Sequence, residues 1–189
     1  MIAMELKKLV VSFTPFPELE TGRFRLRRIS SLDVNEVFAL RSDPETMKYI
    51  PRPLAKTKED ALSFMDMIDK AIDNNLYIHW AISRKDDPKL IGMICLIGLE
   101  PDDYRAELGY ILAPESRGKG VMHEAAGAVI NYAFKRLNFH SLQAIIAPEN
   151  NTSERVLQRL NFVKEAHFRD RRYWNGQFFD DVVYSLIDS

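Results

Sequence analysis

The sequence predicts an α/β fold, with a mixed central sheet of about seven strands and helices on both of its faces. Three observations predict it. Short runs of alternating apolar residues are typical of strands, and longer runs with apolar residues every three to four positions are typical of helices. Strands and helices alternate in the middle of the chain, which favours parallel pairing there. An early strand meander and an Asn-Gly turn near the end favour antiparallel flanks.

The first half of the chain opens with an arm and then predicts strands and helices. Ser and Thr residues before apolar helical patterns are good helix N-caps, and Thr57 with Asp60 has the spacing of a capping box. The expected elements are an arm over residues 1–20, a strand over 23–29, a helix capped by Ser30 or Ser31 and stopped by Asp43-Pro44, a helix that begins at Thr57, and strands over 77–83 and 90–97.

The second half continues with alternating strands and helices. Asn150 to Ser153 supply capping groups for a short helix, and Asn161 can take the left-handed conformation that ends it. Asn175-Gly176 is a strong hairpin signal. The expected elements are a strand over 104–112, a long helix from Val121, a strand over 141–147, a short helix after Asn150, and a hairpin of strands 162–174 and 178–187.

Composition restricts the class of protein. The 189 residues fit one domain with a sizeable core. A net charge of −1 does not support a general electrostatic grip on nucleic acid. The one cysteine, Cys95, lies in an apolar run, so we expect a buried small hydrophobe and no internal disulfide. We see neither a signal peptide nor a membrane-spanning run, so the expected location is the cytoplasm.

One stretch, 107–126, combines a strand, a tight turn and a helix. Gly118 and Gly120 let the turn's backbone approach a ligand, and the helix N-terminus adds unpaired N–H groups and partial positive charge. Arg117 and Lys119 add fixed charge. These features favour a phosphate or pyrophosphate site. The alternative is an ordinary soluble turn, because short glycine motifs are weak signals.

Four pieces of sequence, in this order, resemble the GNAT superfamily of acetyl-CoA-dependent N-acetyltransferases, and within it the RimJ/RimL-like branch. They are LETGRFRLR from Leu19, ELGY from Glu107 leading into RGKGVMHEA, NNTSERVL from Asn150 with the Asn161-Phe162 pair, and WNG from Trp174 followed by 180–186. Two positions depart from the family pattern. Glu115 stands where Gln or Arg is frequent, and Asn161 stands where Gly is common.

The resemblance implies a mostly antiparallel sheet in which the fourth and fifth strands splay apart. It implies one acetyltransferase domain over 1–189, with an acetyl-CoA-binding core over 104–147 and a C-terminal hairpin over 162–187. Acetyl-CoA is the implied co-substrate, without a metal. The implied binding residues are the strand backbone at Ile111, Leu112 and Ala113, the loop N–H groups from Arg117, Gly118, Lys119, Gly120, Val121 and Met122, and the side chain of Asn150.

The same resemblance gives catalytic roles to two residues. Glu107 corresponds to a carboxylate that recurs at this strand start and would act as the base; its alternative is a solvated carboxylate paired with Arg105 or another base. Ser153 corresponds to a residue proposed to hydrogen-bond the leaving thiolate; its alternative is helix capping, as it is for Asn150. A backbone N–H near Leu112 is the expected oxyanion donor. The family's direct attack in a ternary complex leaves no role for Cys95 as a nucleophile.

The acceptor is less well defined. A protein N-terminal α-amine is the leading expectation, and a small amine such as a polyamine, amino acid or antibiotic is the alternative. A third hypothesis is an acyl-CoA-binding module without catalysis. His79 could face the acceptor. Tyr173 and Trp174 could wall the same site, but core packing is the leading expectation for both. The four histidines show no metal-ligand spacing. Relatives are often dimers, so a homodimer is a possible assembly; no membrane or nucleic-acid partner is expected.

Overall fold

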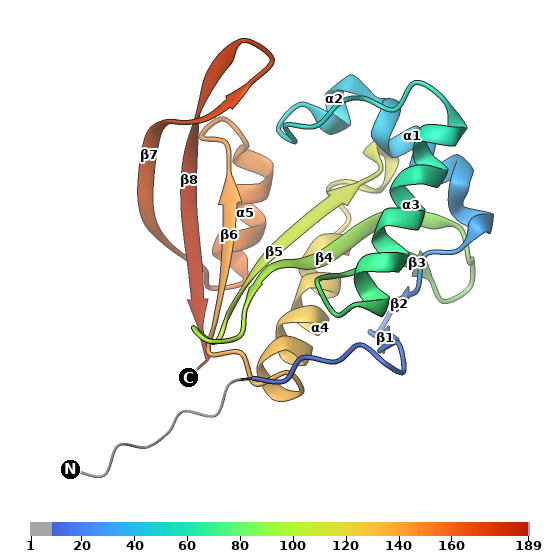
Figure 1. Cartoon of the computed structure of the whole chain (residues 1–189), viewed down its shortest axis with the longest axis horizontal. Helices are drawn as coiled ribbons and strands as arrows, with labels where there is room; N and C mark the ends of the chain where they lie inside the picture. The colour runs from blue at the N-terminus through green and yellow to red at the C-terminus, as the bar shows by residue number, and fades with distance from the viewer. Residues whose placement is uncertain (1–8, 189) are drawn as a thin grey trace.

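The computed structural model describes residues 9–188, which form one eight-stranded sheet with helices on both faces (Figure 1). The strands are β1 (Leu19–Glu20), β2 (Phe24–Arg27), β3 (Ile78–Arg84), β4 (Leu90–Glu100), β5 (Arg105–Leu112), β6 (Ser141–Ile146), β7 (Val163–Trp174) and β8 (Gln177–Ile187). The helices are η1 (Ser31–Asp33), α1 (Val34–Ser42), α2 (Pro44–Met47), α3 (Lys58–Asp73), η2 (Pro114–Ser116), α4 (Val121–Lys135) and α5 (Asn151–Arg159).

The strand order is β1-β2-β3-β4-β5-β6-β8-β7, and β5 with β6 is the parallel pair among antiparallel neighbours. The predicted mixed sheet is therefore confirmed. The count of about seven strands is one short, because Leu19 and Glu20 of the expected arm pair with β2 as an edge strand. The part of that arm over residues 1–8 lies outside the described residues.

The arm is also more than a leading segment, because it contributes to the core. Phe13 is buried, and its N–H donates to Asn75 Oδ1 at 2.7 Å. The indole Nε1–H of buried Trp80 donates to the Pro17 carbonyl at 2.7 Å. These bonds satisfy polar groups that would otherwise be buried without a partner. They tie the arm to β3 and to the end of α3.

Capping residues start α3 and α5 where the sequence predicts, whereas Ser30 is the N-cap of η1 and Asp33 is the N-cap of α1. Thr57 Oγ1 accepts from the Asp60 N–H, and the Asp60 carboxylate accepts from the Thr57 N–H, so the capping box that opens α3 is confirmed. Asp43 ends α1 and then caps α2. Asn161 has φ 64°, as predicted for the residue that ends α5.

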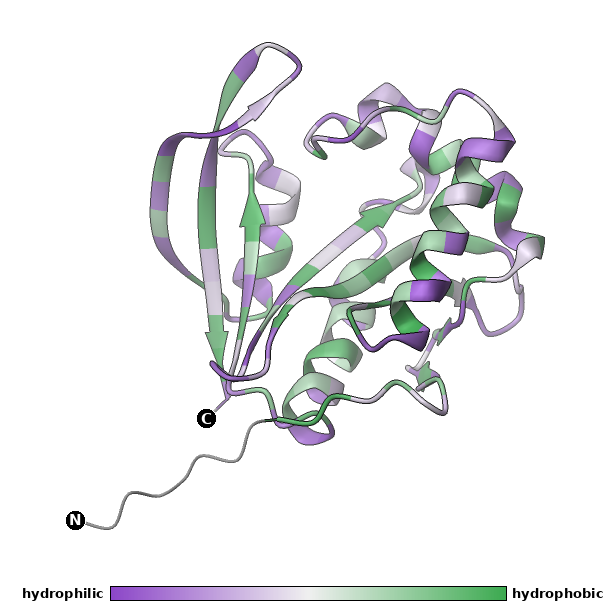
Figure 2. Cartoon of the chain, viewed as in Figure 1, coloured by the Kyte–Doolittle hydropathy of each residue, from purple (hydrophilic) through white to green (hydrophobic). Residues whose placement is uncertain are grey.

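The hydrophobic faces of the helices determine which side of the sheet each helix covers. The α1–α3 layer packs on one face of the sheet, and α4 with α5 packs on the other (Figure 1). Apolar residues of α4, including Val121, Ala125 and Val129, are buried. In Figure 2 the central strands and α4 are largely coloured as hydrophobic, whereas the outer strand β7 carries many hydrophilic residues. The core therefore lies over β2 to β6 and leaves the hairpin more exposed.

Candidate active site

The sheet opens between β5 and β6. The two strands pair only through Arg105–Glu107 and Ser141–Gln143, and beyond Glu107 they diverge (Figure 1). The predicted splay is confirmed. Among the described residues, it leaves one edge of β5, from Leu108 to Leu112, without a neighbouring strand. Backbone N–H and C=O groups need partners, so this edge can pair with an extended ligand.

The direction of the backbone groups shows which N–H group of β5 can donate to a ligand in the gap. The Ala113 N–H donates to the Ile91 carbonyl of β4 at 2.9 Å. Because alternate residues of a strand turn their N–H groups to opposite edges, the Leu112 N–H points into the gap. The Leu112 carbonyl points there too and accepts from Arg117 Nε at 3.2 Å. Of Ile111, Leu112 and Ala113, we therefore assign the free backbone donor to Leu112.

The glycine turn after β5 has an open helix end. Gly118 and Gly120 both have φ 73°, a conformation that favours glycine. Gly120 is the N-cap of α4, and no side chain caps that end. Val121 and Met122 are buried, so they offer only their backbone N–H groups. The turn therefore presents donors and partial positive charge, as an anion site requires.

One member of the expected donor set is already engaged. The Arg117 N–H donates to the Pro114 carbonyl at 3.2 Å within η2. The Arg117 side chain reaches away to Thr46 Oγ1 at 2.8 Å. The available loop donors therefore begin at Gly118, and Arg117 instead links the turn to α2.

A clamp that the sequence analysis missed holds this turn. Arg23 precedes β2, and its Nε lies 2.7 Å from Glu124 Oε2 while its Nη1 donates to the Lys119 carbonyl at 3.1 Å. Its backbone N–H also donates to Glu124 Oε1 at 2.8 Å. An acidic residue in the first turn of a helix was the available signal. The partner 101 residues earlier could not be read from spacing.

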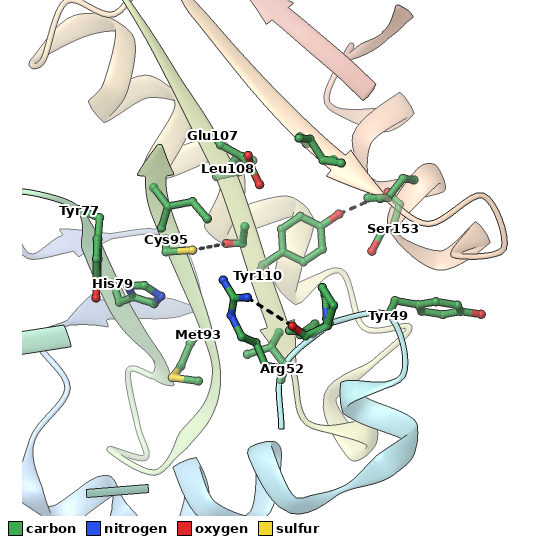
Figure 3. A pocket seen from close by; sticks show the side chains of 18 of the residues that line it. Tyr49, Arg52, Tyr77, His79, Met93, Cys95, Glu107, Leu108, Tyr110 and Ser153 are labelled. Atoms are coloured by element: carbon green, nitrogen blue, oxygen red, sulfur yellow. Dashed lines mark hydrogen bonds between the residues drawn. The ribbon is translucent and has the colours of Figure 1, made fainter. Parts of the chain in front are cut away.

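A cavity of about 870 Å³ fills the gap and continues over the sheet face below α1 and α3. Strand register places three residues side by side on the cavity floor, because His79 pairs with Cys95 and Cys95 pairs with Gly109. Four expected site residues line it, namely Glu107, Ile111, Asn150 and Ser153. The other expected residues, Leu112, Ala113 and the turn from Arg117 to Met122, lie outside its lining. Figure 3 shows Glu107, Tyr110 and Ser153 around this space.

Glu107 sits in the cavity with its charge poorly compensated. Burial raises the pKa of its carboxyl, the charge of Asp181 raises it further, and Arg171 and Arg172 oppose the shift. The expected alternative, a pair with Arg105, is wrong, because Arg105 bonds Glu100. Within residues 9–188 no side chain is hydrogen-bonded to Glu107. A half-buried carboxylate with a raised pKa in a cavity is a candidate general base.

Asn150, Ser153 and Tyr110 join the two sides of the gap. Asn150 Oδ1 accepts the Ser153 N–H at 3.1 Å, so Asn150 caps α5 and its amide NH₂ is left for other partners. The Tyr110 hydroxyl donates to the Ser153 carbonyl at 3.3 Å, and burial raises the pKa of this phenol to about 12 (Figure 3). Tyr110 was missed, because its reach across the gap depends on the splay.

The remaining polar groups of the floor are neutral. Burial and the charge of Arg41 lower the pKa of His79 to about 4, so the imidazole is uncharged at neutral pH. Burial and the charge of Glu107 raise the pKa of the Cys95 thiol to about 12, which confirms Cys95 as a buried small hydrophobe. A thiol with that pKa is a poor nucleophile.

A second cavity adjoins the first. It has a volume of about 570 Å³ and shares its walls at 49–52 and Arg172. Trp174 lines it, and Tyr173 is 66% exposed, so the expected core packing of these two aromatics is wrong. The hairpin lifts both residues away from the core. The Asn175-Gly176 turn itself is confirmed, with both residues at positive φ.

In the chain from residue 9 to residue 188, no group of three or more His, Cys, Asp or Glu side chains could hold a metal ion. None of the helices in that range is long and apolar enough to cross a membrane.

Comparison with known proteins identifies similar chains. Residues 23–163 match the family model described as acetyltransferase (GNAT) domain. The uncharacterized N-acetyltransferase YoaA of Bacillus subtilis (strain 168) is 33% identical over 172 residues, 91% of this chain and 97% of YoaA. A spermidine N(1)-acetyltransferase of Vibrio cholerae is 32% identical over 89% of this chain and 95% of its own. The crystal structure of a ribosomal-protein-S5-alanine acetyltransferase from Vibrio fischeri has a TM-score of 0.79 and 26% identity, covering 92% of this chain and 97% of that one.

Proposed function

The chain belongs to the GNAT acetyltransferase family, and on that premise we propose that it acetylates the N-terminal α-amine of a protein. It is an acetyl-CoA-dependent N-acetyltransferase. The finer statement, the identity of the acceptor, rests on the cavity that joins the two sides of the sheet gap.

The donor side of the proposal assigns acetyl-CoA to the gap and the turn. The pyrophosphate lies at the N–H groups from Gly118 to Met122, where the end of α4 has no side-chain cap. The pantetheine arm pairs with the free edge of β5, and the Asn150 amide NH₂ donates to it. The arm points the thioester toward the Leu112 N–H, which then donates to the carbonyl oxygen as that oxygen gains negative charge.

The acceptor side assigns a proton transfer to Glu107. The Glu107 carboxylate takes a proton from the ammonium group, directly or through water. The neutral amine nitrogen then attacks the thioester carbon, a C–N bond forms and the C–S bond breaks. The departing thiolate accepts a hydrogen bond from the Ser153 hydroxyl and takes up the second nitrogen proton. No acyl-enzyme forms, in keeping with the high pKa of Cys95.

The observation that carries the peptide assignment is the form and charge of the acceptor cavity. Its charged lining is Arg41, Arg52, Arg172, Glu107 and Asp181, which is not net acidic. The adjoining cavity at Trp174 gives room for the residues that follow an N-terminus. The similar Vibrio fischeri structure carries the name of an acetyltransferase for a ribosomal-protein alanine.

A small polyamine is the second candidate acceptor. The observation in its favour is the similarity to a spermidine N(1)-acetyltransferase. A polycation calls for several carboxylates in the cavity, and Asp181 is already paired with Arg172. That pairing favours the peptide. A third candidate, a non-catalytic acyl-CoA-binding module, leaves Glu107 without a task.

A thiol-release assay tests the proposal. Acetyl-CoA is offered with a panel of N-terminal peptides, spermidine and free amino acids. We expect turnover of peptides, a loss of 10²-fold or more in kcat, as an order of magnitude, for Glu107→Gln, and a smaller loss for Ser153→Ala. Preference for spermidine over every peptide would move the assignment to the second candidate. Acetyl-CoA binding without turnover of any amine would support the third.

A further inference from the structure

Arg41 is an arginine of the acceptor cavity that the mechanism leaves unused. It lies near the end of α1, is half-buried, and lines the cavity with Phe64 and His79. Its guanidinium carbon is 3.9 Å from the centre of the Phe64 ring, so the guanidinium stacks on the ring. Phe64 in turn packs edge-on against His79, with 6.2 Å between ring centres.

The charge of Arg41 has no counter-charge among residues 9–188. Burial lowers its pKa, and the charge that adds to this effect is the positive one of Arg52. Of the two acidic residues in the cavity lining, Asp181 is paired with Arg172. The charges that act on Glu107 come from Asp181, Arg171 and Arg172, and Arg41 is not among them. Arg52 is exposed, and among the described residues its side chain donates only to the Pro51 carbonyl next to it (Figure 3).

Other arginines of the chain have the carboxylate partner that Arg41 lacks among the described residues. Arg23, Arg27, Arg28 and Arg172 each hold a carboxylate within hydrogen-bond distance. A cation taken from water into a cavity is costly without such a partner, and stacking on an aromatic ring offsets only part of that cost. A planar guanidinium is suited to bind a carboxylate through two parallel hydrogen bonds. The cavity is therefore built for an anion that arrives with the ligand.

Strand register gives the width of the cavity floor between its His79 end and β5. His79, Cys95 and Gly109 stand opposite one another on β3, β4 and β5. Two interstrand spacings separate the His79 end from the β5 end, roughly 10 Å. Glu107 and the Leu112 N–H belong to β5. An α-carboxylate on the reacting carbon stays next to the amine, whereas the side-chain carboxylate of the first or second residue lies farther along the ligand and can point toward the Arg41 side of the floor.

We infer that Arg41, assisted by Arg52, binds a carboxylate of the acceptor, so that the enzyme selects N-termini with an acidic first or second residue. This inference rests on the proposed acetylation of N-termini and names the class of sequence that the site takes. Arg41 acts here as a specificity-determining residue and takes no part in the proton transfers.

Peptides that differ at one position test the inference. Four peptides begin Ser-Asp, Ser-Asn, Asp-Ser or Asn-Ser and are otherwise identical. We expect wild-type kcat/KM to favour each Asp peptide over its Asn partner by about tenfold or more, as for hydrogen bonds between charged groups. Arg41→Gln should bring that ratio close to one, and Arg41→Lys should leave an intermediate ratio. Arg84→Gln, which removes an exposed arginine paired with Asp86 outside the cavity, should keep the wild-type ratio.

The outcomes separate the inference from the proposed function. Peptides acetylated without an acidic preference, or with a preference that survives Arg41→Gln, overturn the inference and leave the function standing. If only small amines turn over, the peptide function fails, and a comparison of free glutamate with free glutamine as acceptors tests the inference. A preference for glutamate that is lost in Arg41→Gln supports the inference. Equal rates, or a preference for spermidine, overturn it. If no amine turns over, calorimetry measures how the acetylated Ser-Asp and Ser-Asn peptides bind in the presence of CoA. Tighter binding of the Ser-Asp peptide by wild type, but not by Arg41→Gln, supports the inference. Equal binding of the two peptides overturns it.

Discussion

Glu107 illustrates, at the scale of one residue, how a site uses an unfavourable environment. Its carboxylate lies in a cavity, faces Asp181 and has no hydrogen-bonding side chain among the described residues. An ionised carboxylate in that position is less stable than one in water. The same shift that destabilises the charge brings the pKa nearer to the pH at which a base must accept and release protons.

The raised pKa of Glu107 predicts a pH dependence with a definite sign. The carboxylate is the active form, so kcat should be lost as the pH falls through the raised pKa, above the ordinary glutamate range. The protein should lose some stability as the pH rises through the same value, because the folded state then holds an ill-compensated charge. We therefore expect Glu107→Gln to lose the acidic limb of the kcat profile and to be more stable than wild type at neutral pH. An unchanged limb in Glu107→Gln would assign it to another group.

Asn150 caps a helix and has a second, proposed task, and substitution can separate the two. Its Oδ1 caps α5, and its NH₂ is the group assigned to pantetheine. Asn150→Asp keeps the cap and removes the donor, so we expect near wild-type stability with a severalfold higher KM for acetyl-CoA. Asn150→Ala should also lose about 1 kcal/mol of stability from the missing cap. Thermal unfolding and acetyl-CoA kinetics measure the two effects. An unchanged KM in Asn150→Asp would leave Asn150 with capping alone.

Substitution of Ser153 can separate the proposed catalytic role of its hydroxyl from the capping alternative. The capping bond at α5 uses the Ser153 backbone N–H, which Ser153→Ala retains. We therefore expect Ser153→Ala to unfold at the wild-type temperature and to lose kcat by a few-fold. A loss of kcat accompanied by an equal loss of stability would point to a structural role for the hydroxyl.

At the scale of elements, the turn between β5 and α4 is defined by backbone conformation. A Cβ on Gly118 would meet nothing within 4 Å, and its φ of 73° is the only internal reason for glycine. Gly176 in the hairpin has the same two properties, with φ 82°. The two positions are therefore a matched pair, one at the proposed phosphate site and one far from it in the chain.

We expect Gly118→Ala and Gly176→Ala to lose similar stability, roughly 1–2 kcal/mol from the left-handed conformation. Only Gly118→Ala should raise the KM for acetyl-CoA, because its new methyl group occupies the approach to the turn's N–H groups. Urea unfolding and kinetics on the two variants check this. Equal KM values for both variants and wild type would argue against phosphates at this turn.

The stability of the whole molecule depends on how the helical layer is tied to the sheet. Asp33 precedes α1 and is buried, and it accepts hydrogen bonds from Arg27 of β2 at 2.7 and 2.8 Å. Burial alone would raise the pKa of Asp33, but the bonds from Arg27 and Ser30 outweigh burial and lower it. Arg27 also donates to the Pro88 carbonyl at 2.7 Å. One ion pair thus joins the sheet, the start of the helical layer and the β3–β4 connection.

Removing this pair should destabilise the whole fold. We expect Asp33→Asn to lose about 3–5 kcal/mol, as is typical when one partner of a buried pair is lost. Because the folded-state pKa is lowered, the contribution is present at neutral pH and should be lost as the pH falls below the ordinary aspartate range. Wild type and variant should therefore converge in stability at acid pH. Asp66→Asn, which removes an exposed pair with Lys70, is the control with little expected effect.

Most of the fold could be predicted from local sequence patterns. Capping boxes, left-handed Asn and Gly residues and apolar alternation act between residues close in the chain, so Thr57, Asn161 and Asn175-Gly176 could be interpreted without coordinates. The order of the elements, with the resemblance to the GNAT family, led to the mixed sheet and its splay. The errors lay where one element meets a distant one: the extra edge strand at Leu19 and the exposed aromatics of the hairpin.

The proposed donor half of the site could be predicted from the sequence by itself, because the roles proposed for Gly118, Gly120 and Asn150 depend on backbone conformation and helix ends, which are local. The tertiary structure decided the rest. It showed that the Leu112 N–H faces the gap and that Arg23 clamps Glu124. It also left Arg41 with no carboxylate partner in the part of the chain that it describes. Burial and pairing between distant residues set the pKa of Glu107 and the charge of the acceptor cavity, and neither is encoded in residue spacing.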